Sequence, residues 1–219
     1  MPDPGTNLAG EILATARAMT TLGLNQGTSG NVSAREAQGF LITPSGIAYD
    51  AMTPQQMVRM AFDGTAEGAL APSSEWRFHR DILANRPEIG AIVHAHPIQA
   101  TALAVHGRGI GAFHYMVAIA GGTDIRCAPY ATFGSQELSD HVLRALEGRK
   151  ACLMAHHGMI ACGADLAEAL KIAVEVETLA AQYLAALAIG EPPELDQGEM
   201  AKVIEKFRAG YGYASGPED

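Results

Sequence analysis

Cysteine is scarce in this sequence. The 219 residues contain three, Cys127, Cys152 and Cys162, which lie far apart and form no Cys-x-x-Cys pair. This number and spacing exclude a disulfide framework and a thiolate zinc site. Isolated cysteines are typical of a reduced compartment, so we expect a cytoplasmic protein without disulfide bonds.

Positive charge and long apolar runs are lacking as well. Fifteen lysines and arginines against 24 acidic residues give a formal net charge of −9, and no basic cluster stands out. Such a chain is repelled by nucleic acid and by anionic membrane surfaces. No segment approaches the roughly 20 apolar residues of a membrane-spanning helix, and residues 1–19 lack the order of a signal peptide. We therefore expect neither nucleic acid nor a membrane as a partner.

Apolar residues, by contrast, make up 48% of the chain, enough for the core of one domain. Helical periodicity predicts helices over residues 7–22 and 165–189, one that Pro87 ends, one that begins at Pro97, and a short one in the tail. Short β-branched runs predict strands within 39–46, 91–97 and 150–163, the last range holding two strands with a turn at Gly158.

These elements interleave without regular βαβ spacing, repeats or a long linker. The sequence therefore predicts an α/β fold: a three-layer αβα domain over residues 1–219 with a mainly antiparallel central sheet. We expect the tail, residues 198–219, to be partly irregular.

Two histidine pairs end predicted apolar strands. His94 and His96 are two residues apart, so on a strand their imidazoles point to the same side and can converge on one ion. That pair alone also fits the solvated face of a sheet. His156 and His157 end a second strand, and because successive strand residues face opposite ways, we expect one of them to join the first pair. Three imidazoles with an open coordination position are the layout of a catalytic zinc site.

Three turn segments, within residues 27–31, 44–46 and 72–74, are rich in glycine, serine, threonine and asparagine. Such turns offer backbone N–H groups and hydroxyls to a phosphate dianion, although each alone is an ordinary turn or helix cap. Their recurrence beside a predicted metal site favours a phosphate cradle made of neutral donors. We assign no metal to the other histidines considered: we expect His106 and His141 at the surface and His79 on a helix near Glu75, where it can orient that carboxylate.

Seven segments in the same order resemble the class II aldolase/adducin family, most closely its L-fuculose-1-phosphate aldolase branch. They are GLNQGTSGNVSAR, ITPSGIAYD, PSSEWRFHRDI, VHAHPIQATALA, HYMVAIAGG, CAPYATFGSQELSDHV and LMAHHGMIACG. Together these blocks run through most of the chain, and their common order is highly specific.

The resemblance implies a complete site. It assigns His94, His96 and His157 to Zn²⁺, with Glu75 at the metal as acid/base. Co²⁺, Mn²⁺ or Fe²⁺ suit the same ligands. It implies a homotetramer with active sites between subunits, to which Tyr115 and Tyr211 reach from a neighbouring subunit. The positions that match the family's phosphate-binding residues are Thr28, Asn31, Ser45, Gly46, Ser73 and Ser74.

The implied reaction is reversible cleavage of a ketose 1-phosphate to dihydroxyacetone phosphate and an aldehyde. The substrate would be L-fuculose 1-phosphate or a 5-deoxy- or methylthio-pentulose 1-phosphate. The four lysines lie in charged, helix-surface or turn contexts, which favours metal over Schiff-base chemistry.

Two alternatives remain at this stage. Pentulose-phosphate 4-epimerases and methylthioribulose-1-phosphate dehydratases use the same scaffold for other reactions. Adducin-type domains keep the fold as an interaction module, which the intact set of three histidines and a glutamate disfavours. Without the resemblance, Glu75 would be explained as a helix-start residue that complements the helix dipole.

Overall fold

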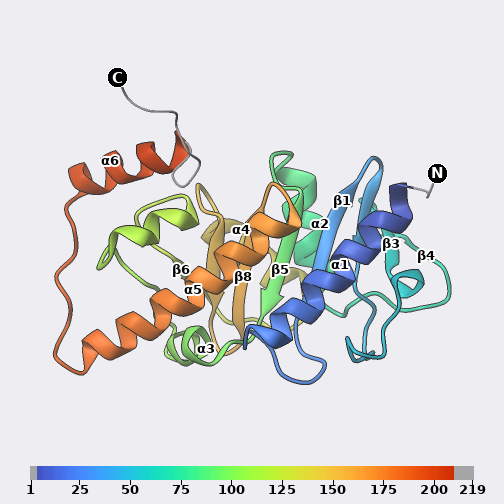
Figure 1. The fold of residues 1–219 in the computed structure, drawn as a ribbon, viewed down its shortest axis with the longest axis horizontal. Helices are drawn as coiled ribbons and strands as arrows, with labels where there is room; N and C mark the ends of the chain where they lie inside the picture. The colour runs from blue at the N-terminus through green and yellow to red at the C-terminus, as the bar shows by residue number, and fades with distance from the viewer. Residues whose placement is uncertain (1–3, 210–219) are drawn as a thin grey trace.

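A single mixed sheet organises the computed structural model, which describes residues 4–209 (Figure 1). Its strand order is β4-β3-β2-β1-β5-β8-β7-β6, and every neighbouring pair is antiparallel except β6 with β7. The strands are β1 (Asn31–Glu36), β2 (Gly39–Ile42), β3 (Val58–Ala61), β4 (Ala66–Glu67), β5 (Ala91–Ala95), β6 (Arg126–Ala128), β7 (Ala151–Met154) and β8 (Gly158–Gly163). The predicted α/β class with a mostly antiparallel sheet is confirmed.

Helices cover both faces of this sheet. They are α1 (Pro4–Thr21), α2 (Trp76–Asn85), α3 (Ile98–Val105), α4 (Gln136–Ala145), α5 (Leu166–Leu187) and α6 (Gln197–Arg208), with 3₁₀ segments η1 (Pro54–Gln56) and η2 (Tyr115–Ala120). Val93 of β5 packs into the core beneath α1, α3 and α5, whereas its neighbour Ile92 packs beneath α2 and α4. This alternation follows from the period of two along a strand and produces the three layers.

The helices begin and end at capping residues and prolines that the sequence predicts. Gly23, with φ 75°, follows α1 as a left-handed C-terminal residue. Asp165 accepts a hydrogen bond from the backbone N–H of Glu168 at 2.8 Å, and the Glu168 carboxylate accepts one from Ala164 N–H, so a reciprocal cap begins α5. Helix α2 ends before Pro87.

Gly158 serves a different purpose from the predicted one. The turn covers residues 155–157, and Gly158 is the first residue of β8, opposite Met154. A Cβ atom at this position would lie 2.5 Å from the carbonyl oxygen of Ala95 and 2.6 Å from the His96 ring. Glycine is required here because the start of β8 approaches the end of β5 and the His96 ring too closely for a side chain.

No helix among residues 4–209 is long and apolar enough to cross a membrane. The helix expected in the tail is α6; residues 210–219, with Tyr211, lie outside the described part of the chain. The cytoplasmic location and the extent of the domain over residues 1–219 stay predictions.

Candidate active site

The structure brings together the four side chains predicted to hold a metal. One ligand atom each from Glu75, His94, His96 and His157 lies within 4.8 Å of the other three. Glu75 is the N-terminal cap residue of α2, His94 and His96 lie at the end of β5, and His157 belongs to the turn before β8. Because β5 pairs with β8, the register that places Ala95 opposite Met159 carries His157 to the strand end that holds His96.

The orientation of His94 favours a cation. Its Nδ1 lies 2.8 Å from the carbonyl oxygen of Met159, so Nδ1 carries hydrogen, and in the neutral ring Nε2 presents a lone pair. This Nε2 faces Glu75 Oε2 and His96 Nε2, each at 2.9 Å. Two lone pairs and a carboxylate repel one another unless a positive charge lies among them. A backbone acceptor on the second ring nitrogen is the usual way in which proteins orient metal-binding histidines.

Glu75 completes a donor set that suits a divalent ion. Its Oε1 is buried and receives no hydrogen bond from the described residues, although it lies 3.0 Å from His157 Nε2. Burial alone would raise the pKa of Glu75, but the imidazoles of His94 and His157 hold that pKa well below its usual range. Burial and the neighbouring His94 lower the pKa of His96 to about 3. A carboxylate and three imidazoles, with one buried oxygen left without a donor, fit a metal ion of the Zn²⁺ type.

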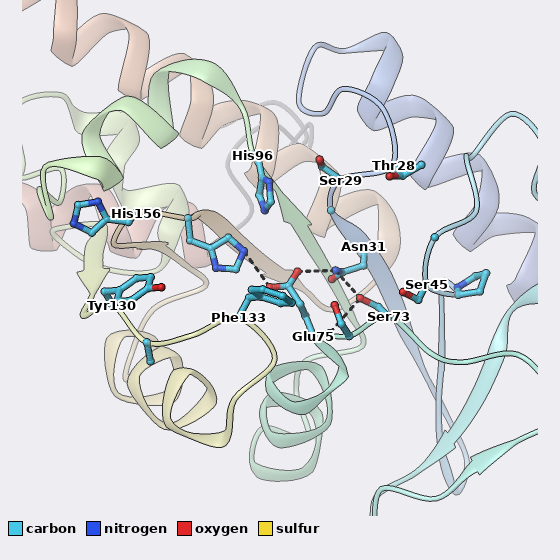
Figure 2. Close-up of a pocket in the computed structure, with 16 residues that line it drawn as sticks. Thr28, Ser29, Asn31, Ser45, Ser73, Glu75, His96, Tyr130, Phe133 and His156 are labelled. Atoms are coloured by element: carbon cyan, nitrogen blue, oxygen red, sulfur yellow. Dashed lines mark hydrogen bonds and ion pairs between the residues drawn. The ribbon is translucent and has the colours of Figure 1, made fainter.

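A cavity of about 370 Å³ opens beside this cluster (Figure 2). Glu75, His96 and His157 line it together with all six residues predicted to hold phosphate: Thr28, Asn31, Ser45, Gly46, Ser73 and Ser74. The second and third of the turn segments lie side by side because Pro44 pairs with Pro72 and Ser73 N–H donates to the carbonyl of Thr43 at 3.1 Å. Among residues 4–209, no lysine or arginine lines the cavity, so an anion would meet neutral donors from this part of the chain.

The first turn segment is held by residues that the sequence gave no reason to single out. Asn25, which is 2% exposed, donates to the carbonyl of Ser29 and accepts from the backbone N–H of His96, both at 2.8 Å. The hydroxyl of Tyr49 donates to the carbonyl of Gly30 at 2.8 Å. Asn25 therefore ties the glycine-rich turn to the strand that carries the histidines.

Gly30 is where this packing is tightest, and replacing it tests the arrangement. A Cβ there would lie 2.0 Å from Asn25 Nδ2 and 2.5 Å from the carbonyl oxygen of His94, at a φ of 77°. We expect Gly30→Ala to lower the free energy of unfolding by roughly 2–5 kcal/mol because the new methyl group collides with fixed atoms. Denaturant titration measures this loss.

The matched control is Gly27→Ala. Gly27 has a similar φ of 67°, but nothing lies within 4 Å of the added carbon. It should cost only the conformational penalty of about 1 kcal/mol. Equal losses in the two variants would contradict the close approach at Gly30.

The other predicted residues lie apart from the cluster. Tyr115 is on η2 and is 41% exposed, and it is not among the residues lining the cavity. His106 is exposed, and the ring of His141 interacts with the carbonyl of Pro129 at 3.1 Å. His79 is fully buried behind Glu75, and burial lowers its pKa to about 3, so the ring is neutral.

Three residues of the cavity wall were not predicted from the sequence: Tyr130, Ala131 and Phe133. His156, which the sequence offered as a possible metal ligand, lines the cavity beside them. Figure 2 shows Tyr130 and His156 on the opposite side of the cluster from Thr28 and Ser45. The rings of Tyr130 and His156 meet edge to face, with centroids 5.8 Å apart. His156 has a φ of 55°, the only positive value for a non-glycine among the described residues, so the backbone turns its side chain away from that of His157.

Comparison with known proteins agrees with this geometry. The family model described as "Class II Aldolase and Adducin N-terminal domain" matches residues 10–184. This chain belongs to the class II aldolase/adducin family. Membership accounts for the fold, and the histidine and glutamate cluster could bind the metal ion on which class II aldolases depend.

Several curated class II aldolases resemble the chain over nearly its whole length. The 5-methylthioribulose-1-phosphate/5-deoxyribulose-1-phosphate aldolase of Rhodospirillum rubrum is 55% identical over 212 residues, which cover 97% of this chain and 96% of that protein. The L-fuculose phosphate aldolase of Escherichia coli is 52% identical over 206 residues, covering 94% and 95%. A solved structure of an L-fuculose 1-phosphate aldolase superimposes with a TM-score of 0.90 at 39% identity, covering 92% of this chain and 96% of the other.

Proposed function

We propose that this protein is a zinc-dependent aldolase that cleaves a ketose 1-phosphate reversibly to dihydroxyacetone phosphate and an aldehyde. One observation carries the proposal: a buried carboxylate and three imidazoles converge at one wall of a cavity whose other wall is lined by hydroxyls and turn backbone. The similarity to aldolases named for L-fuculose phosphate and for methylthioribulose and deoxyribulose phosphates supports it.

The metal would be held by His94, His96, His157 and Glu75. A divalent ion there supplies Lewis-acid stabilisation for the electron pair that carbon–carbon cleavage leaves beside a ketone. Zn²⁺ suits imidazole and carboxylate ligands, and Co²⁺, Mn²⁺ or Fe²⁺ are the alternatives.

The chain's own groups would orient the substrate and move its protons. Ser45, Gly46, Ser73 and Ser74, with Thr28 and Asn31, bind the phosphate and so place the ketone next to the histidines. Glu75 is ionised and adjacent to that position, so in the condensation direction it removes the proton from C3 of dihydroxyacetone phosphate. In the cleavage direction Glu75 first takes up a proton from solvent and then passes it to C3. Tyr115 from a neighbouring subunit assists removal of the C4 hydroxyl proton, which its phenol passes on to solvent, with Tyr211 in a similar supporting role.

The family resemblance implies a homotetramer, and the position of Tyr115 supports delivery from a second copy. Tyr115 lies on the exposed side of η2 rather than at its own cavity, so a second copy has to deliver it. The proposal therefore places the active sites between subunits. It also makes the protein a cytoplasmic enzyme whose partner is a small sugar phosphate.

The principal rivals are a pentulose-phosphate 4-epimerase and a methylthioribulose-1-phosphate dehydratase, which would use a similar metal site without releasing a three-carbon fragment. An adducin-like interaction domain has no need for four converging metal-binding side chains. Product identity separates these functions.

The test is a panel of ketose 1-phosphates: L-fuculose 1-phosphate, 5-deoxyribulose 1-phosphate and 5-methylthioribulose 1-phosphate. We expect stoichiometric dihydroxyacetone phosphate, measured by a coupled dehydrogenase, from at least one of them, and we expect the active species to have the mass of four chains by light scattering. Consumption of substrate without this product would favour the epimerase or the dehydratase. No turnover and no bound metal would favour the interaction domain.

A further inference from the structure

Behind Glu75 lies a chain of hydrogen bonds that ends in two residues outside the cavity. Asn31 Nδ2 donates to Glu75 Oε2 at 3.1 Å and to Ser73 Oγ at 2.9 Å. Asn31 Oδ1 is bonded to His79 Nε2, and His79 Nδ1 lies 2.7 Å from Ser33 Oγ. Ser33 and His79 are both 0% exposed, and neither lines the cavity.

The chemistry of these groups leaves one arrangement of hydrogens. The Glu75 carboxylate accepts only, so the amide must present its NH₂ end to it and its oxygen to His79. That oxygen needs a donor, so His79 carries hydrogen on Nε2. In a neutral ring Nδ1 then accepts, and the Ser33 hydroxyl donates to it. Each bond determines the direction of the next, from Ser33 to the carboxylate.

These hydrogen bonds are buried, so reversing their donor-to-acceptor direction is costly. If the His79 hydrogen moved to Nδ1, Asn31 Oδ1 would lose its donor, and if the amide flipped, its oxygen would face the carboxylate. Either change leaves buried acceptors facing one another, which costs more than a bond exchanged with water. The Ser33 hydroxyl therefore influences Glu75 although it does not touch it.

We propose that Ser33 and His79 are positioning residues that orient the Asn31 amide and, through it, hold the Glu75 carboxylate at the metal with Oε1 directed toward the ligand position. This rests on the proposed function only in treating Glu75 as a metal ligand and proton carrier. It also gives the Asn31 side chain a supporting role in place of a direct contact with the phosphate. Both of its amide hydrogens are already bonded, one to the phosphate cradle at Ser73 and one to Glu75, so this amide connects the two halves of the site.

The test compares Ser33→Ala with Ser139→Ala. Ser139 is an equally buried serine whose hydroxyl donates to Asp81 at 2.6 Å, between α2 and α4, without a path to Glu75. Both variants lose one buried hydroxyl, so they should lose similar thermal stability. Only the hydrogen bond lost in Ser33→Ala belongs to the series that reaches the Glu75 carboxylate.

The readout that does not depend on turnover is Co²⁺ titrated into the metal-free protein. We expect Ser33→Ala to shift the visible Co²⁺ absorption band and to weaken Co²⁺ binding by about tenfold, the size of one buried hydrogen bond. In the zinc enzyme kcat should fall by a similar factor with KM nearly unchanged, because the phosphate contacts remain. Ser139→Ala should keep the Co²⁺ spectrum, the Co²⁺ affinity and kcat of the parent.

A second pair of variants covers the case in which Ser33→Ala does not fold. His79→Gln keeps a donor at the position of Nε2, whereas His79→Leu removes it. We expect the glutamine variant to retain the parental Co²⁺ spectrum and most of kcat, and the leucine variant to lose both.

Parental Co²⁺ spectra and affinities in Ser33→Ala and His79→Leu would overturn the proposal. If the wild-type protein cleaves none of the sugar phosphates, the proposed function fails, yet the Co²⁺ titrations still decide whether the chain of hydrogen bonds orients Glu75.

Discussion

Replacing Glu75 by glutamine is expected to abolish cleavage while most of the metal remains bound. The three imidazoles are untouched, and the amide has nearly the shape of the carboxylate. It cannot carry a proton to or from carbon, however, and loss of a general acid/base lowers kcat by about a thousandfold. The amide also places an NH₂ group or a neutral oxygen where Glu75 Oε1 now lies 3.0 Å from His157 Nε2.

Two measurements together test this expectation: the rate of dihydroxyacetone phosphate release and the metal content of the purified variant. The matched control is Glu168→Gln. It removes a carboxylate from α5, where Glu168 pairs with Lys150 at 2.6 Å at the opposite end of β8, so kcat should stay near the parental value. A Glu75→Gln enzyme of normal activity would remove Glu75 from the proton-carrying role.

Removing the metal should have an effect of similar size. Dialysis against a chelator is expected to reduce cleavage to background, and stoichiometric Zn²⁺ or Co²⁺ should restore it. The described residues place no lysine or arginine at the cavity to stabilise the charge that cleavage develops. The metal binds only the folded cluster, so at one hundred times its dissociation constant it should add about 2.7 kcal/mol to the free energy of unfolding. Assays and thermal unfolding, each before and after reconstitution, measure these changes.

Reduction with borohydride is the control for the alternative, a mechanism through a lysine Schiff base. An enzyme that used a lysine Schiff base would be inactivated when reduced in the presence of substrate, and it would tolerate the chelator. We expect this protein to keep its activity after borohydride treatment and to lose it with the chelator. Activity that survives chelation but is lost on reduction would assign the chemistry to one of the four lysines instead.

Much of the fold could be predicted because its signals are local. Helical periodicity predicted α5 and α1, and Asp165 with Glu168 announced the start of α5. The spacing of His94 and His96 indicated that both rings share one side of a strand end, as observed. Tyr115 and the 3₁₀ turn that carries it show the limit: the segment has no periodicity, so its structure was not foreseen.

The choice between His156 and His157 shows what local rules leave open. Alternation along a strand predicted that one of them would join the cluster, and only the family resemblance indicated His157. In the structure both lie in the turn, where the left-handed backbone at His156 separates the two rings. A rule for strands therefore predicted that one histidine of this pair joins the cluster, but it had no means to select the residue.

The sequence by itself determined the layers of the fold, the two histidine pairs of the site and the turn chemistry beside them, since these depend on periodicity and on neighbours a few residues apart. The role of Glu75 came only from the family resemblance. Only the tertiary structure decided which groups hold the site in place. Asn25 reaches His96, Tyr49 reaches Gly30, and Ser33 acts on Glu75 through His79 and Asn31. These hydrogen bonds join segments far apart in the chain. The partner of a buried polar group depends on which groups lie near it in space. Residue spacing along the sequence does not reveal that.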